Sequence, residues 1–266
     1  MKPSAQLRVT LCQTDIVWQD IEANFVRLSP KLAALPETDL VVLPEMFATG
    51  FTMQPDTLPD DVGERCVAWL SQQAKQTGAC YCASTPYRLP DGQFVNRMVF
   101  VEPSGKTRYY DKRHRFAMAG EHEAYAPGSA LPVVVRCKGW RLLLQVCYDL
   151  RFPCFARNTA GDAGYDAMIY VANWPEARRV HWQVLAKARA IENQAYCLVV
   201  NRVGSDENGL NYVGDTCAID AHGDVLVAAS DGEEAMISTQ LDYSALQALR
   251  RRLPFLADAD AFRLLP

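Results

Sequence analysis

Two hydrophobic periodicities alternate along the first part of this 266-residue chain, and this alternation restricts its possible folds more than any other feature. The segment LRVTLCQTD (7–15) reads as a strand, residues 20–35 repeat apolar side chains at helical spacing, and DLVVLPEMF (39–47) reads as another strand. A strand, a helix and a further strand in this order form a β-α-β unit. The chain is therefore predicted to contain a sheet that is covered by helices.

The rest of the chain continues this series and adds hairpins. The expected elements are, in chain order, a helix at 62–77, a strand at 79–88, hairpins at 96–112 and 133–149, a helix at 179–194, a strand at 195–204 and a hairpin at 216–230. Residues from about 243 onward look helical and then irregular. Because β-α-β units are mixed with hairpins, we predict an α/β fold with parallel and antiparallel strands, and no linker or repeat divides it.

The charge balance favours a small-molecule partner. The chain has 27 Lys and Arg against 31 Asp and Glu, a formal net charge of −4, which argues against a large basic surface for nucleic acid or anionic membrane. No window approaches the ~20 uninterrupted apolar residues that a membrane helix needs. The nine cysteines fit neither a disulfide framework nor C-x-x-C metal spacing. We expect a cytoplasmic protein without a membrane or nucleic-acid partner.

Three polar residues stand at the ends of apolar strands, namely Glu45, Lys112 and Cys147. The carboxyl end of a strand in an α/β sheet opens into the crevice where ligands bind. The three side chains supply a base, a cation and a nucleophile. Taken singly, each is more often structural: a surface carboxylate, a solvated cation and a buried small hydrophobe. The local sequence around them decides between the two interpretations.

That local sequence resembles a known family. The segments LPEMFATGF around Glu45, YDKRHRF around Lys112 and CYDLRFP at Cys147 resemble, in the same chain order, three signature blocks of the nitrilase or carbon-nitrogen hydrolase superfamily. The CYDLRFP form is similar to that of small amidases such as omega-amidase. The resemblance implies a four-layer α-β-β-α sandwich with mixed sheets. It also implies one domain over residues 1–266, with a core at about 7–242 and a tail at 243–266, and no metal or organic cofactor.

The resemblance further implies catalytic roles. Glu45, Lys112 and Cys147 form the expected triad, joined by a second glutamate after the lysine, for which spacing favours Glu121 over Glu123. A thiolate at Cys147 attacks the amide carbon, Lys112 favours the thiolate, and Glu45 receives the thiol proton. Hydrolysis then divides into formation and cleavage of a thioester, two easier steps than direct attack by water.

Donors for the oxyanion and for the substrate are also predicted. Lys112 and the backbone N–H of Tyr148 are expected to stabilise the negative charge that develops on the substrate oxygen. The segment VANWPEARR follows an apolar strand, and guanidinium groups offer paired donors for a substrate carboxylate. The candidate substrate-binding residues are Asn173, Trp174, Arg178, Arg179 and Arg202.

We therefore expect hydrolysis of a small omega-amide of a dicarboxylate, of the 2-oxoglutaramate or 2-oxosuccinamate type, to the acid and ammonia. The first alternative is another hydrolase of the same superfamily, acting on a nitrile, an N-carbamoyl amino acid or a different amide. A non-catalytic interaction module, or a thiol sensor that uses Cys147, belongs to a different functional class. A homodimer or higher homo-oligomer is also implied, and the tail supplies apolar side chains for it: Leu253, Phe255, Leu256, Phe262, Leu264 and Leu265.

Overall fold

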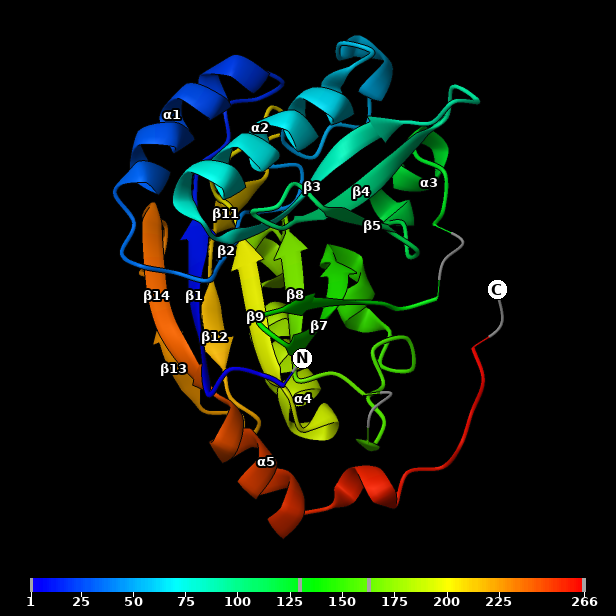
Figure 1. Cartoon of the computed structure of the whole chain (residues 1–266). Helices are drawn as coiled ribbons and strands as arrows, with labels where there is room; N and C mark the ends of the chain where they lie inside the picture. Colours follow the sequence, from blue (N-terminus) through cyan, green and yellow to red (C-terminus); the bar gives the residue numbers. More distant parts are fainter. Residues whose placement is uncertain (1, 129–130, 162–163, 265–266) are drawn as a thin grey trace.

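The computed structural model describes residues 2–128, 131–161 and 164–264 and contains two six-stranded mixed sheets packed face to face (Figure 1). The first sheet has the order β14-β1-β2-β3-β4-β5 and the second has the order β13-β12-β9-β8-β7-β6. The first consists of β1 (Gln6–Gln13), β2 (Leu40–Val42), β3 (Cys80–Arg88), β4 (Phe94–Val101), β5 (Thr107–Asp111) and β14 (Ala235–Asp242). The second consists of β6 (Val133–Cys137), β7 (Trp140–Val146), β8 (Ala167–Ala172), β9 (Tyr196–Asn201), β12 (Cys217–Ile219) and β13 (Val225–Ala228).

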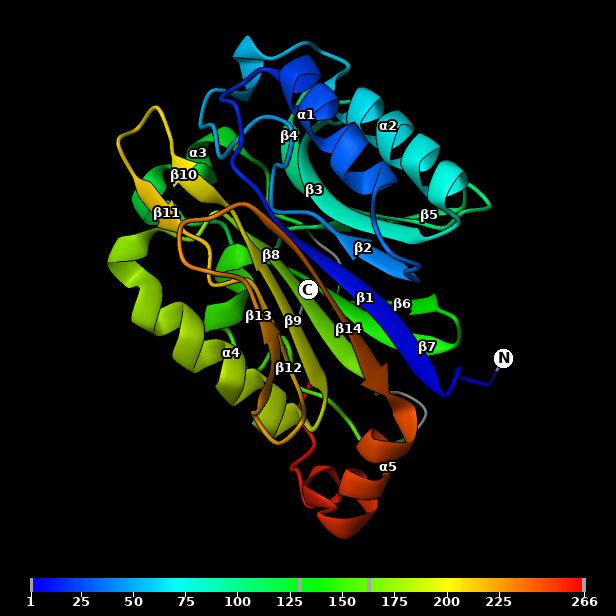
Figure 2. The same cartoon turned by 90° about the vertical axis from the view of Figure 1, so that its left-hand side faces the viewer.

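Helices cover the outer faces of both sheets (Figure 2). Helices α1 and α2 lie on the first sheet, and α4 lies on the second, so the predicted α-β-β-α layering is confirmed. The described helices are α1 (Ile21–Ala33), α2 (Val62–Thr77), α3 (Glu121–Ala124), α4 (Arg179–Asn193) and α5 (Tyr243–Arg252). Within the three described ranges, no helix is long and apolar enough to cross a membrane.

The core has two parts, separated by the first sheet. One cluster joins Leu11 and Val42 of the first sheet to Leu144 and Ile169 of the second. The other packs helices α1 and α2 against the opposite face of the first sheet, where Val41 lies. Val41 and Val42 are neighbours in β2 and point to opposite faces, because side chains alternate along a strand. Burial of both faces explains why β2 reads as a continuous apolar run.

Two strands of the first sheet differ from the sequence-based expectation. The strand expected at 39–47 ends at Val42, because Pro44 offers no N–H to a ladder and Met46 takes a positive φ of 46° in the following turn. Strand β14 was not anticipated, yet it pairs antiparallel with β1 along its whole length, from Gln6↔Asp242 to Gln13↔Ala235. It is an edge strand with one partly exposed face, so its sequence MISTQLD lacks a long apolar run.

The C-terminal segment folds partly onto its own subunit. Leu253 and Leu264 pack against the core between the sheets, and Leu256 is buried. Phe255 and Phe262 are more than half exposed, and Leu265 lies outside the described residues.

Candidate active site

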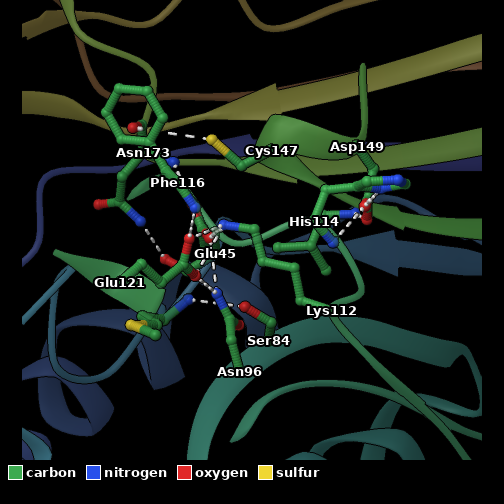
Figure 3. A network of polar contacts seen from close by, with 12 residues as sticks. Glu45, Ser84, Asn96, Lys112, His114, Phe116, Glu121, Cys147, Asp149 and Asn173 are labelled. Carbon is green, nitrogen blue, oxygen red and sulfur yellow. Dashed lines mark hydrogen bonds and ion pairs between the residues drawn. The ribbon is translucent and has the colours of Figure 1, made fainter. Parts of the chain in front are cut away.

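The polar residues predicted at strand ends come together at one edge of the two sheets (Figure 3). In the first sheet, β2 and β3 are parallel and β5 runs in the same direction, so Glu45 after β2 and Lys112 after β5 share an edge. In the second sheet, β7 and β8 are parallel, which places Cys147 next to Asn173. The facing sheets thus contribute two members each to one cluster.

Lys112 lies at the centre of this cluster. Its Nζ is 2.9 Å from Glu45 Oε1 and 2.9 Å from both carboxylate oxygens of Glu121. All three side chains are 0% exposed. Glu121 also accepts a hydrogen bond from the backbone N–H of Phe116 at 2.5 Å. Of the two glutamates considered from the sequence, Glu121 therefore contacts the lysine, whereas Glu123 is exposed.

Two asparagines hold the Glu45 carboxylate in place. Asn96 Nδ2 donates to Glu45 Oε1 at 2.7 Å, and the backbone N–H of Asn173 donates to Oε2 at 2.8 Å. The Asn173 amide also donates to the backbone carbonyl of Glu45 at 2.6 Å. The sequence analysis missed Asn96; the only signal was a polar residue inside the apolar run NRMVFV.

The electrostatic balance keeps Lys112 charged. Burial acts to lower its pKa, but the carboxylates of Glu121 and Glu45 outweigh this and raise the pKa well above its usual range. Burial raises the pKa of Glu121 and the charge of Glu45 adds to the rise, while Lys112 acts in the opposite direction. The ammonium is therefore a fixed positive charge near neutral pH.

Cys147 begins a 3-10 turn, Cys147–Arg151, directly after β7 and has a positive φ of 43°. As expected from the sequence, Lys112 acts in favour of a thiolate here, but two stronger effects oppose it. Burial raises the pKa of Cys147 well above its ordinary value, the Glu45 carboxylate raises it further, and Lys112 only partly opposes them. The resting side chain is therefore a thiol facing a carboxylate, which suits transfer of its proton to Glu45 during attack.

The thiol opens into a cavity of about 370 Å³. Its described lining residues are Phe51, Met53, Phe116, Met118, Ala119, Cys147, Tyr148, Arg151, Asn173, Trp174, Pro175, Arg178, Asp206, Asn208, Leu210 and Tyr212. The last four come from a separate hairpin, β10 (Val203–Ser205) and β11 (Asn211–Val213), and from the turn between its strands. The volume and the mixture of aromatic and polar walls are typical of a small-molecule site.

Two guanidinium groups lie on the cavity wall. Arg178, which the sequence analysis proposed, has its guanidinium carbon 5.0 Å from the centre of the Phe116 ring. Arg151 lies 4.7 Å from the Trp174 ring and within 3.1 Å of His181 Nδ1. Predicted residues Asn173, Trp174 and Tyr148 also line the cavity.

Arg179 and Arg202, also predicted to bind substrate, are not among the described residues of this wall. Arg179 pairs with Asp215 at 2.8 Å and with Asp231 at 2.5 Å beside a different cavity. Arg202 is fully buried, and its guanidinium contacts Asp15 at 2.9 Å. Both cations are held by carboxylates that are distant in the sequence.

Comparison with known proteins identifies the family. The sequence profile of the carbon-nitrogen hydrolase family matches residues 8–251, which is most of the chain. The chain belongs to the carbon-nitrogen hydrolase family. It is 45% identical to omega-amidase YafV of Yersinia enterocolitica over 97% of this chain and 99% of that protein. It is 31% identical to 2-oxoglutaramate amidase of Paenarthrobacter nicotinovorans over 91% of this chain and 85% of that protein.

A solved structure shares the whole architecture of this carbon-nitrogen hydrolase. XC1258 of Xanthomonas campestris, a CN-hydrolase superfamily protein with an arsenic adduct in its active site, superimposes with a TM-score of 0.93. The two sequences are 39% identical, and the match covers 98% of this chain and 100% of XC1258. Among the described residues of this chain, no group of three or more His, Cys, Asp or Glu side chains is arranged to hold a metal ion.

Proposed function

We propose that this amidase hydrolyses the omega-amide of a small dicarboxylate, of the 2-oxoglutaramate or 2-oxosuccinamate type, through a thioester on Cys147. The observation that carries the proposal is the buried cluster of Glu45, Lys112 and Glu121 beside Cys147, whose thiol opens into a cavity that presents two arginines. The names of the relatives from Yersinia and Paenarthrobacter agree with this substrate class.

The first half-reaction begins with attack of Cys147 Sγ on the amide carbon. The thiol proton passes to Glu45, because the thiol is protonated at rest and Glu45 is the carboxylate beside it. Collapse of the tetrahedral intermediate breaks the carbon–nitrogen bond, and Glu45 returns the proton to the departing ammonia. The product of this step is an acyl thioester on Cys147 and a free ammonia molecule.

In the second half-reaction water attacks the thioester carbon while Glu45 accepts the water proton. Breakage of the carbon–sulfur bond releases the carboxylic acid, and the proton returns to the sulfur. Asn96 and the Asn173 N–H keep the Glu45 carboxylate in one orientation for both steps. One carboxylate therefore serves as the base and the acid throughout the cycle.

Lys112 has a donor available for the oxyanion. An ammonium group has three N–H donors, of which one faces Glu45 Oε1 and one is shared between the two oxygens of Glu121. The third is assigned to the substrate oxygen, together with the backbone N–H of Tyr148. Removal of one oxyanion donor typically raises the barrier by about 3–4 kcal/mol.

Selectivity is assigned to the arginines on the cavity wall. Arg151 and Arg178 are half-buried and stack on aromatic rings, so each has a fixed place from which to pair with a substrate carboxylate. A neutral analogue leaves such a cation without its partner. Losing a charged hydrogen-bond partner typically costs about 2–5 kcal/mol, which corresponds to at least about tenfold in kcat/KM.

The test compares 2-oxoglutaramate and succinamate with the methyl ester of succinamate, an aliphatic nitrile and an N-carbamoyl amino acid. We expect the free acids to be hydrolysed at least about tenfold faster than the ester, and this ratio to fall in Arg151→Gln or Arg178→Gln. Cys147→Ala should lose turnover and keep the fold. Faster turnover of the nitrile or the carbamoyl compound assigns the chain to another activity of the family.

We also propose that the enzyme works as a homodimer in the cytoplasm. The nine cysteines are all unpaired, including Cys80 and Cys137, whose Sγ atoms are 3.6 Å apart. A reducing compartment keeps such a close pair as thiols. The surface that supports dimerisation is a row of exposed apolar side chains on α4.

A further inference from the structure

We infer that His114 and Asp149 are positioning residues that fix the separation of Lys112 and Cys147 across the two sheets. The inference rests on the catalytic roles proposed above for Lys112 and Cys147. In the described part of the chain, neither His114 nor Asp149 lines the cavity, and the two side chains hydrogen-bond to each other. Their effect on the reaction passes through the two residues that they hold.

Asp149 accepts four hydrogen bonds although its side chain is fully buried. Its Oδ1 atom accepts from His114 Nδ1 at 2.7 Å and from the backbone N–H of His114 at 3.3 Å (Figure 3). Its Oδ2 atom accepts from the Tyr110 hydroxyl at 2.8 Å and from the backbone N–H of Val146 at 2.9 Å. A buried carboxylate requires several donors, and here they come from two separate segments.

These two segments carry the proposed nucleophile and its cation. Tyr110 and His114 lie two residues before and two residues after Lys112, at the end of the first sheet. Val146 and Asp149 flank Cys147 at the end of β7 in the second sheet. One carboxylate therefore ties the segment that holds the ammonium to the turn that holds the sulfur.

The turn at Cys147 depends on this restraint. Its φ of 43° is unfavourable for a residue with a side chain and persists only when the surroundings enforce it. The bond from the Val146 N–H to Asp149 fixes the start of the turn, and His114 holds Asp149 from the opposite sheet. A displacement of about 1 Å between reacting groups costs on the order of 10²-fold in rate.

Packing and hydrogen bonding of His114 are separable by substitution. Its ring stacks on Phe152, with ring centres 3.8 Å apart and planes inclined by 8°. His114→Phe keeps a ring for this stack and removes the donor to Asp149. His114→Asn removes the ring and retains an N–H close to the position of Nδ1. His122→Phe, at an exposed histidine on α3, is the matched control.

The experiment measures kcat and KM for succinamate, together with the rate at which iodoacetamide alkylates Cys147, followed by peptide mass mapping. In His114→Phe we expect kcat to fall on the order of 10²-fold with KM little changed, and alkylation to slow as well. His114→Asn should recover most of both rates, and His122→Phe should match the wild type. Equal loss in His114→Phe and His114→Asn, or wild-type rates in His114→Phe, would overturn the inference.

Two further measurements keep the result decisive. If His114→Phe does not fold, Tyr110→Phe removes another donor to the same carboxylate, and wild-type kcat and alkylation in that variant count against the inference. Different results would contradict the proposed function, namely turnover that persists in Cys147→Ala or a wild type that hydrolyses no omega-amide. In that case the alkylation rates still report whether His114 sets the reactivity of Cys147.

Discussion

Lys112, Glu45 and Glu121 form a buried charge cluster in which each residue depends on the other two. Their side chains are fully buried, and one ammonium faces two carboxylates at 2.9 Å. Removing one partner from a buried ion pair leaves an uncompensated charge and typically costs about 3–5 kcal/mol. The cluster therefore contributes to folding as well as to catalysis.

Lys112→Met should abolish turnover and make stability depend on pH. Without the ammonium, burial and the Glu45 carboxylate raise the pKa of Glu121 further, although the hydrogen bond from the Phe116 N–H still opposes them. A carboxyl group whose folded pKa is raised contributes stability that is full below its unfolded pKa of about 4.3 and is lost as the pH rises. Urea unfolding should therefore show that Lys112→Met loses more unfolding free energy between pH 5 and pH 8 than the wild type does.

The control for this measurement is Lys75→Met, which removes an exposed lysine at the end of α2. Its unfolding free energy should follow that of the wild type at both pH values. A Lys112→Met curve parallel to the wild-type curve between pH 5 and 8 would show that the two carboxylates are not held together as described.

At the scale of elements, the hairpin β10–β11 forms a wall of the active site from outside the two main sheets. Arg202 anchors its base, since its guanidinium donates to the carbonyl oxygens of Val203, Ser205 and Ile16 and lies 4.7 Å from the Tyr212 ring. This cation, which resembled a substrate contact in the sequence, thus acts beneath the wall and not on it.

Tyr212→Phe should loosen this wall and weaken substrate binding. The Tyr212 hydroxyl donates to Asp206 Oδ2 at 2.8 Å, and both residues line the cavity. Loss of one hydrogen bond typically costs about 0.5–1.5 kcal/mol, so KM should rise about two- to tenfold while kcat changes little. Steady-state kinetics on succinamate measure this. Glu207→Gln, an exposed neighbour at the hairpin tip, should leave KM unchanged.

The sequence predicted most of the framework and only part of the site. Glu45, Lys112 and Cys147 each follow a strand, which made them candidates, and the resemblance of the three surrounding segments to one family indicated that they act together. Arg179 and Arg202 lie beside Asp215 and Asp15, which are 36 and 187 residues away in the sequence. Pairing over such distances follows from tertiary packing and leaves no periodic signal.

At the scale of the whole molecule, α4 exposes a row of apolar side chains. Val180, Val184 and Ile191 are 66%, 60% and 47% exposed, and their spacing places them on one side of the helix. Helix α4 covers the second sheet, so this row faces away from the core. Such a surface is more typical of a subunit contact than of a free helix face.

Val184→Glu should convert a homodimer into monomers, because an interface would have to bury its charge. Sedimentation velocity at micromolar concentration should show a dimer for the wild type and a monomer for the variant. Val26→Glu replaces a valine of α1 that is 71% exposed, and this control should remain dimeric. A monomeric wild type, or a dimeric Val184→Glu, would contradict the assignment.

The buried thiols should make the whole molecule sensitive to alkali. Burial raises the pKa of Cys66 to about 12 and that of Cys217 to about 12, above the unfolded value of about 8.5. Each thiol contributes fully to the free energy of unfolding below its unfolded pKa. Between the unfolded and the folded pKa, this contribution falls by about 1.4 kcal/mol per pH unit. Urea unfolding between pH 8 and 10 should show a shallower decline in Cys66→Ala, and an unchanged decline in Cys154→Ser, where the thiol is exposed.

The pairing of β14 with β1 joins the last strand of the chain to the first. During synthesis the ribosome releases Glu45, Lys112 and Glu121 well before Cys147, and β14 follows after nearly a hundred further residues. The nascent chain thus carries an unpaired edge at β1 until β14 has been synthesised. A prematurely terminated chain is therefore expected to be inactive and prone to aggregation, because β1 offers its open edge to other chains.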